Sequence, residues 1–165
     1  MTEREYLDRA MSEAECACEA HTYPVGAVIV DPTGKIIGEG HNRVYSDGDF
    51  TSHAEVEAIR NAGDQLMKQP NFNTCTLYTT MEPCLMCSGA ILMARIARVI
   101  WILDDDLHGA LRRLHDHDHP LSNYYSEKIA TLKFHPSDEY DLVQRMASLM
   151  ETWNMAKEGR LSQLR

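Results

Sequence analysis

Two short apolar runs constrain the fold of this chain more than any other feature. Val25–Val30 reads VGAVIV and Arg98–Leu103 reads RVIWIL, so both runs are apolar almost without interruption. A strand with one face in water alternates apolar and polar residues, whereas a strand buried on both faces is apolar throughout. The two runs therefore predict a sheet that is covered by helices on both faces.

The segments around the first run complete a helix and a hairpin. Residues 3–20 place small or apolar side chains at helical spacing, with acidic residues opposite. The sequence Asp31-Pro32-Thr33-Gly34 is typical of a tight turn, so Lys35–Gly40 is expected to return as the second strand.

Two further helices are expected to begin directly after loops or strands. The first begins near His53, with Thr51 or Ser52 as its N-cap. The second runs through Cys84–Arg95 with Pro83 in its first turn, where the missing N–H of proline costs no hydrogen bond.

The remaining elements complete one domain over residues 1–165. Strand composition is found at Cys75–Thr80 and Thr131–His135, whereas residues 104–126 are polar and are predicted to be irregular. The last helix starts after Ser137 and has one broad apolar face. The sequence thus predicts an α/β fold with a sheet of about five strands.

Two motifs carry candidate metal ligands, His53-Ala54-Glu55 and Pro83-Cys84-Leu85-Met86-Cys87. Zinc prefers cysteine and histidine in a tetrahedron, and three protein ligands leave a fourth position for water. Cys84 and Cys87 are three residues apart and so share one helix face, where the positive helix end favours thiolates. We therefore expect His53, Cys84 and Cys87 to bind one Zn²⁺ per chain.

Glu55 is the candidate catalytic residue, because it stands close to this ligand set without being needed as a ligand. Its carboxylate can take a proton from a water that zinc activates and deliver it to the substrate. The combined pattern H-x-E…P-C-x-x-C is typical of zinc deaminases that act on bases. A closed structural zinc site, with Cys75 or a later histidine as fourth ligand, is the alternative, but it leaves Glu55 without a role.

At these residues the chain resembles the cytidine and deoxycytidylate deaminase superfamily. The nearest branch holds tRNA adenosine deaminases, bacterial guanine deaminases and fungal cytosine deaminase. The resemblance runs from about Leu7 to Trp101 and is carried by four segments: Pro24–Val30, Gly38–Asn42, His53–Glu55 and Leu77–Ala90. It implies a three-layer α/β/α sandwich with a five-stranded mixed sheet, and it implies a homodimer.

The resemblance also implies roles for individual residues. His53, Cys84 and Cys87 would bind zinc, and Glu55 would shuttle protons. The side-chain amide of Asn42 and the main chain of Ala27 and Cys84 would contact the substrate base. Asp105 aligns with an acidic residue of the tRNA adenosine deaminases, so it is a further candidate for substrate contact.

The charge of the chain bears on the choice of substrate. Sixteen Lys and Arg against 25 Asp and Glu give a formal net charge of −9, whereas nucleic-acid binders present a basic face. Asp104 and Asp106 flank Asp105, and carboxylates beside RNA phosphates oppose binding. Arg112 and Arg113 are the only local compensation.

The sequence therefore favours an enzyme, a hydrolase of C–N bonds in cyclic amidines. Its substrate is expected to be a free nucleobase or nucleoside of guanine, cytosine or adenine type, with ammonia as a product. A tRNA-specific adenosine deaminase that forms inosine is the first alternative. A catalytically silent zinc-binding partner subunit is the second, but it would have no need of Glu55.

Three other features lead to expectations. The five cysteines are an odd number, and neither a leader nor a membrane-length apolar run is seen, so a cytoplasmic location is expected. The run His115-Asp116-His117-Asp118-His119 is interpreted as a solvated loop, with a second metal site or a pH-responsive lid as the alternative. Trp153 and Phe134 are expected in the core.

Overall fold

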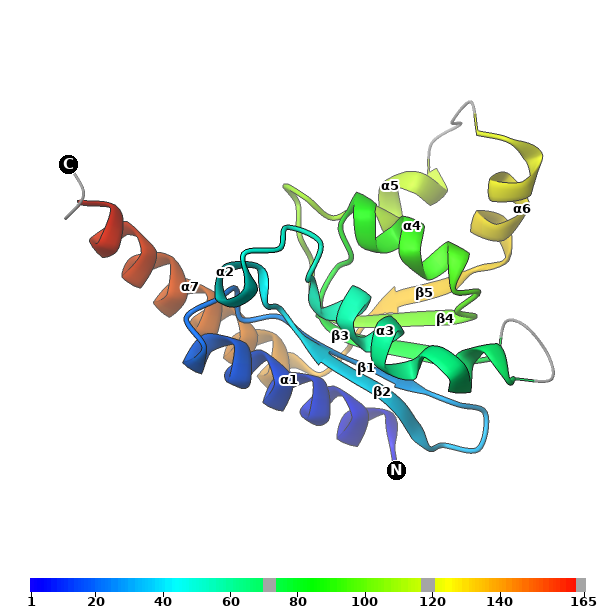
Figure 1. Cartoon of the computed structure of the whole chain (residues 1–165), viewed down its shortest axis with the longest axis horizontal. Coiled ribbons are helices and arrows are strands. Elements are labelled where there is room, and N and C mark those ends of the chain that lie inside the picture. Colours follow the sequence, from blue (N-terminus) through cyan, green and yellow to red (C-terminus); the bar gives the residue numbers. More distant parts are fainter. Residues whose placement is uncertain (70–73, 117–120, 163–165) are drawn as a thin grey trace.

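The computed structural model describes residues 1–69, 74–116 and 121–162. Within these residues, five strands form one sheet in the order β2-β1-β3-β4-β5 (Figure 1). The strands are β1 Gly26–Val30, β2 Ile36–His41, β3 Thr76–Met81, β4 Arg98–Leu103 and β5 Lys133–Pro136. β1 pairs antiparallel with β2 and β3, whereas β3, β4 and β5 run parallel, so the predicted mixed sheet and hairpin are confirmed.

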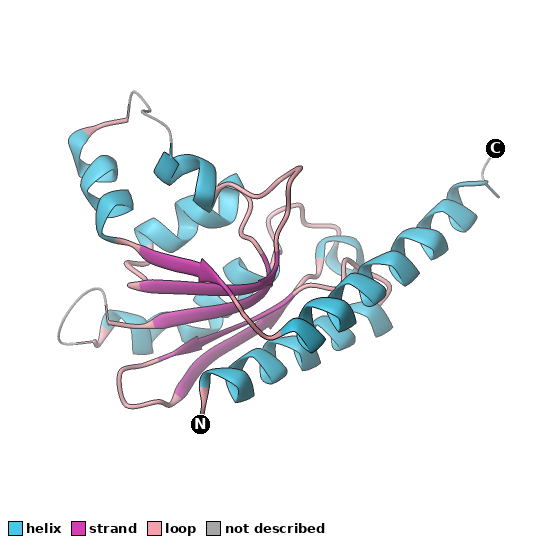
Figure 2. Ribbon diagram, turned by 180° about the vertical axis from the view of Figure 1, so that it is seen from behind, coloured by secondary structure: helices cyan, strands magenta, loops and turns pink. Residues whose placement is uncertain are grey.

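Helices cover both faces of this sheet. They are α1 Glu3–Glu19, α2 Val44–Asp47, α3 Ala54–Met67, α4 Leu85–Met93, α5 Leu111–Asp116, α6 Asn123–Thr131 and α7 Tyr140–Ser162. α1 and α7 lie on one face, and α3 and α4 lie on the other (Figures 1 and 2). The chain is therefore the three-layer α/β/α sandwich that the resemblance implies.

The continuous apolar runs have the cause that the sequence indicates. In β1, Val28 packs in the core under α1 and α7, whereas Ala27 and Ile29 pack in the core under α3 and α4. Ile100 and Trp101 of β4 divide between the two cores in the same way. Because successive side chains of a strand point to opposite faces, both cores require apolar residues at every position.

Glycines in β2 allow α3 to approach the sheet closely. A Cβ at Gly38 would lie 2.4 Å from the carbonyl oxygen of Ala58, and one at Gly40 would lie 2.4 Å from the backbone nitrogen of the same residue. No side chain fits at either position without moving the helix. This contact fixes where α3 begins, and His53 stands at its start.

The N-caps of α3 and α4 differ from the predicted positions. His53 itself is the N-cap of α3, so the prediction of Thr51 or Ser52 is wrong. Thr51 instead donates its hydroxyl to Asp49 at 2.8 Å, within the preceding turn. Cys84 is the N-cap of α4, so Pro83 precedes the cap and does not lie in the first turn.

The prediction of irregular structure over residues 104–126 is wrong where α5 and the start of α6 occupy it. α6 has no buried residue among its described positions, and its contacts with the core come from the half-buried Tyr125 and Ile129. Such a helix lacks the apolar stripe that a sequence pattern can detect. Of the histidine run, His115 lies in α5 with its ring edge-on to Phe134, whereas His117 and His119 lie outside the described residues.

The core prediction is confirmed for Trp153, which is 3% exposed. Phe134 is half-buried, and its ring stacks on Trp101 with 5.9 Å between ring centroids. Among the described residues, no helix combines the length and the apolar character needed to cross a bilayer.

Candidate metal centre

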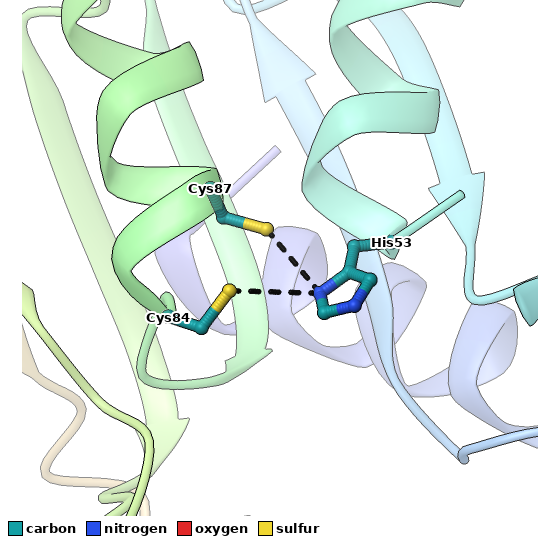
Figure 3. Close-up of side chains that lie close together, drawn as sticks. All are labelled: His53, Cys84 and Cys87. Carbon is teal, nitrogen blue, oxygen red and sulfur yellow. Dashed lines mark hydrogen bonds between the residues drawn. The ribbon is translucent and has the colours of Figure 1, made fainter. Parts of the chain in front are cut away.

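One histidine and two cysteines meet where α3 and α4 begin. The Nδ1 atom of His53 lies 3.6 Å from the Sγ atom of Cys84 and 3.5 Å from that of Cys87 (Figure 3). All three ligand atoms lie within 4.8 Å of one another. The structure therefore brings the three predicted ligands together as a group that could hold a metal ion.

The local fold explains why the two sulfurs converge. Cys84 is the N-cap of α4 and Cys87 is in its first turn, so their side chains share one face. Cys84 also forms an antiparallel bridge with Gly109, and the Ala110 N–H donates to the Pro83 carbonyl at 2.9 Å. The segment after β4 thus holds the start of α4 in place.

The electrostatics of the group favour a thiolate at Cys84. Hydrogen bonds from Cys87 and from His53 lower the pKa of Cys84 to about 4. The pKa of Cys87 is raised by its hydrogen bond to Cys84, by burial and by the Glu55 charge. A divalent cation held by this group would favour the thiolate form of both cysteines.

Glu55 lies beside the ligands, as the sequence predicts. Glu55 is 3% exposed, and its Oε2 atom accepts a hydrogen bond from Cys87 Sγ at 3.3 Å. Burial raises the pKa of this carboxyl above its usual value. The carboxyl is thus a buried proton donor or acceptor next to a metal-binding group.

Asn42 lies at the end of β2, close to the start of α3. The backbone N–H of the next residue, Arg43, donates to the Ser52 carbonyl at 2.8 Å, directly before His53. Ala27 is fully buried in β1 and pairs with Gly40, two residues before Asn42. The structure therefore places Asn42 beside the segment that leads into the ligand set, and Ala27 in the adjoining strand.

Asp105 shapes the turn after β4. Its Oδ1 atom accepts hydrogen bonds from the backbone N–H groups of Leu107, at 3.0 Å, and His108, at 2.8 Å. One of its two carboxylate oxygens is therefore occupied by the turn itself.

Glu82 and Arg112 form a pair that the sequence analysis missed. The Glu82 side chain is 1% exposed, and its Oε2 atom lies 2.7 Å from Nη2 of Arg112. Arg112 also lies 3.3 Å from carboxylate oxygens of Asp104 and Asp106. The one feature of the sequence that could have drawn attention to Glu82 is its position directly before the Pro83–Cys87 motif. The positive charge of Arg112, which was expected to offset the local acidic charge, is therefore paired with carboxylates of the chain itself.

Comparisons with known proteins agree with this site. A model of the family described as "Cytidine and deoxycytidylate deaminase zinc-binding region" matches residues 1–103. The chain is 44% identical over 105 residues to a tRNA-specific adenosine deaminase of Haemophilus influenzae, covering 63% of this chain and 60% of the relative. Among solved structures, one from biochemical and structural studies of A-to-I editing by tRNA:A34 deaminases matches with a TM-score of 0.69 at 28% identity, covering 87% of this chain and 99% of the other. The guanine deaminase of Bacillus subtilis has a TM-score of 0.58 at 32% identity, covering 79% and 93%.

The chain spans only part of some relatives. It covers 60% of the Haemophilus protein. It covers 19% of the tRNA(Ile)-lysidine synthase of Deinococcus radiodurans, with 41% identity over 110 residues, and 21% of that of Deinococcus deserti, with 43% identity over 114 residues. Each of these two matches includes 67% of this chain. The family match nevertheless includes all three residues of the metal-binding group. The chain therefore belongs to the cytidine and deoxycytidylate deaminase zinc-binding family, with zinc as its cofactor.

Proposed function

We propose that this chain is a zinc-dependent hydrolytic deaminase, which replaces an exocyclic amine of a nucleobase by oxygen and releases ammonia. The buried carboxyl of Glu55, 3.3 Å from Cys87 Sγ, is the observation that carries the proposal. A structural zinc site has no use for a desolvated acid that is not a ligand. The same carboxyl argues against a catalytically silent partner subunit.

In this proposal His53, Cys84 and Cys87 hold the zinc. When bound, zinc supplies Lewis acidity, which makes a water molecule nucleophilic at neutral pH. Glu55 takes one proton from the attacking water and passes it to a ring nitrogen. It then carries the remaining hydroxyl proton to the amino nitrogen, the C–N bond breaks, and ammonia leaves as the carbonyl forms. A carboxyl whose pKa is raised by burial suits this double role, since it must both accept and donate a proton near neutral pH.

The same proposal assigns substrate contacts to three further residues. The Asn42 amide and the main chain of Ala27 would hold the base near the ligand set. Asp105 would contact substrate through Oδ2, which lies 3.5 Å from His108 Nδ1, because its Oδ1 atom already accepts two backbone hydrogen bonds.

An adenosine in tRNA is the first substrate that we propose. The similarity to tRNA-specific adenosine deaminases supports it, with 44% identity to the protein of Haemophilus influenzae. This alternative agrees with the comparisons at least as well as the free-nucleobase interpretation that the sequence favoured.

A free nucleobase such as guanine is the second candidate, and one observation of the structure favours it. Arg112 pairs with Glu82, Asp104 and Asp106, so its charge is already balanced by carboxylates rather than available to RNA phosphates. The 32% identity to the guanine deaminase of Bacillus subtilis also supports this candidate.

We also propose that the chain is a cytoplasmic homodimer. Leu85, Met86 and Met93 are large apolar side chains on α4 that are exposed in the single chain, as expected of a helix that a second copy covers. All five cysteines are free, which suits a reducing compartment. Light scattering coupled to gel filtration tests the dimer.

The activity is tested by ammonia release from a panel of substrates. The zinc-loaded chain is incubated with a tRNA that carries adenosine at the first anticodon position, and separately with guanine, cytosine, adenine and adenosine. Turnover of tRNA alone supports the first candidate, and turnover of a free base alone supports the second. No zinc-dependent turnover of any of them would overturn the proposed activity.

A further inference from the structure

We propose that Asn42 meets its substrate only as a hydrogen-bond donor, and that Thr22 is the positioning residue that fixes this polarity. The inference rests on the proposed function, because it specifies how the amide of Asn42 would read a base. It goes further in two respects: it says which atom of the amide is available, and it identifies a second residue that acts through it.

The hydrogen bonds around Asn42 leave no choice of amide orientation. The backbone N–H of Val44 lies 3.1 Å from Oδ1, and a backbone N–H can only donate, so the atom that it meets is the oxygen. Thr22 Oγ1 lies 2.6 Å from the same oxygen. Because Thr22 Oγ1 accepts from the backbone N–H of Tyr45 at 3.3 Å, its own hydrogen is directed to Asn42.

The nitrogen of the amide is left for a ligand. No described residue accepts a hydrogen bond from Nδ2 of Asn42. In the described ranges, the only fully buried side-chain nitrogen or oxygen without a hydrogen-bond partner is Trp153 Nε1. Since Nδ2 of Asn42 also has no partner there, it cannot be fully buried and must be reachable from outside the protein. Asn42 as a whole is 3% exposed, so this amide is a nearly buried group with one open end. Such a group favours a ligand that presents a hydrogen-bond acceptor.

The C-terminal helix supports this arrangement from outside the region that the family model matches. Trp153 of α7 packs on Tyr23, with 4.1 Å between ring centroids, and lies 6.2 Å from the ring of Tyr45. Lys157 Nζ donates to the Tyr23 hydroxyl at 3.1 Å. Tyr23 follows Thr22 in the chain, and Tyr45 supplies the N–H that orients the threonine hydroxyl. α7 therefore packs against Tyr23 and Tyr45, the two residues that position the Thr22 hydroxyl toward Asn42.

The polarity has a consequence for specificity. A base with an acceptor facing Nδ2 gains a hydrogen bond, whereas a base with a donor there leaves two N–H groups opposed. Discrimination of this kind exceeds what apolar contacts achieve, because the wrong base leaves a nearly buried polar group unpaired.

The test compares Thr22→Val, which removes the hydroxyl but keeps the shape, with Thr22→Ser, which keeps the hydroxyl. KM and kcat are measured on whichever substrate of the panel is turned over, and zinc content and Tm are recorded for each variant. We expect Thr22→Val to raise KM about tenfold with kcat within about twofold of wild type, as for one lost hydrogen bond. Thr22→Ser is expected to restore KM. A Thr22→Val variant that loses kcat and zinc while KM stays unchanged would show a merely structural role.

A second pair of variants keeps the inference testable if Thr22→Val does not fold. Asn42→Asp keeps Oδ1 for Thr22 and Val44 but replaces the donor by an acceptor, whereas Asn42→Ala only removes it. In the zinc-loaded Glu55→Gln protein, which separates binding from turnover, we expect Asn42→Ala to weaken binding of that substrate about tenfold and Asn42→Asp about a further tenfold. Equal binding by Asn42→Asp and the parent would overturn the donor assignment.

A double-mutant cycle tests whether Thr22 acts through Asn42. With Asn42→Ala already present, Thr22→Val should change KM less than twofold, because the group that it positions is gone. Full additivity of the two effects would contradict the positioning role. Absence of turnover and of binding in the wild-type chain would instead be a failure of the proposed function, which is a distinguishable result.

Discussion

The thiol of Cys87 donates a hydrogen bond to Oε2 of Glu55 over 3.3 Å. One side chain of the metal-binding group and the nearest acid are thus in direct contact. Burial raises the pKa of Glu55, whereas hydrogen bonds from Cys87 and His53 lower that of Cys84, so the group that favours metal binding and the group that can transfer protons are different side chains. The two roles, metal binding and proton transfer, can therefore be removed one at a time.

The first prediction concerns that separation. Glu55→Gln is expected to keep about one zinc per chain and to lose turnover by about 10²- to 10⁴-fold, since the amide cannot transfer protons. Cys84→Ala is expected to lose most of its zinc, because one of three ligands is gone. Metal analysis of the purified variants, with ammonia release, checks both. Loss of zinc from Glu55→Gln would mean that the carboxyl is a ligand.

The second prediction concerns the buried ion pair of Glu82. Arg112→Ala leaves that buried carboxylate without a cationic partner, with hydrogen bonds only from the backbone N–H groups of residues 105 and 112, so the free energy of unfolding should fall by about 1–3 kcal/mol. The value is at the lower end for a buried pair because Arg112 is 35% exposed and partly screened by water. Denaturant unfolding measures it. Arg112→Lys keeps the charge but not the planar guanidinium, so its free energy of unfolding should lie between those of wild type and Arg112→Ala. Wild-type stability in Arg112→Ala would show that the ion pair with Glu82 does not stabilise the fold.

The third prediction concerns the glycine contact that fixes the start of α3. In Gly40→Ala the new Cβ would lie 2.4 Å from Ala58 N and 2.6 Å from Ala54 O, so α3 must move away from β2. We expect a loss of about 1–3 kcal/mol in stability and weaker zinc binding, because His53 moves with the helix.

Gly89→Ala is the matched control for this substitution, since within one chain nothing lies within 4 Å of a Cβ there. It should stabilise α4 by up to about 1 kcal/mol, through the better helix propensity of alanine. Thermal unfolding and zinc titration of both variants decide the matter. Equal effects of the two substitutions would show that close packing at Gly40 is not what positions α3.

The fourth prediction is a pH dependence. Hydrogen bonds from Arg4, at 2.7 and 2.9 Å, lower the pKa of Asp141 below its ordinary value of 3.8. The folded state therefore binds this proton less readily than the unfolded state. The stabilisation is present above the ordinary pKa and is lost as the pH falls through the lowered one.

Asp141→Asn should accordingly have a lower Tm than wild type at pH 7, and the difference should shrink as the pH falls below the ordinary pKa of 3.8 and vanish once the pH is below the lowered pKa. Asp138→Asn is the control, because Asp138 is exposed and has no side-chain partner among the described residues. Thermal scans across the pH range test this. A Tm difference that persisted at the acid end would exclude the ion pair with Arg4 as its cause.

The sequence predicted those parts of the fold and site that depend on local patterns. The apolar run of β1 reports burial on both faces, and the spacing of Cys84 and Cys87 reports a shared helix face. The N-caps were misplaced because His53 and Cys84 occupy them without any side-chain capping bond, so no capping residue type marks the boundary.

Other features depend on contacts between distant segments. Glu82 meets Arg112 across 30 positions, and Thr22 meets Asn42 across 20, and neither pair has a spacing that a pattern can show. α6 escaped prediction because tertiary contacts of Tyr125 and Ile129 hold it in place without a buried stripe. The substrate is harder still to predict, since local charge at Asp104 and Asp106 depends on where Arg112 points.

The most direct test of the central claim is ammonia release by the zinc-loaded chain from the panel of tRNA and free bases, in parallel with its Glu55→Gln variant. We predict that at least one substrate is deaminated, that a chelator abolishes the activity and zinc restores it, and that Glu55→Gln is inactive while it retains its metal. No deamination of any substrate by the fully zinc-loaded chain, or equal rates for the chain and its Glu55→Gln variant, would contradict the proposed activity.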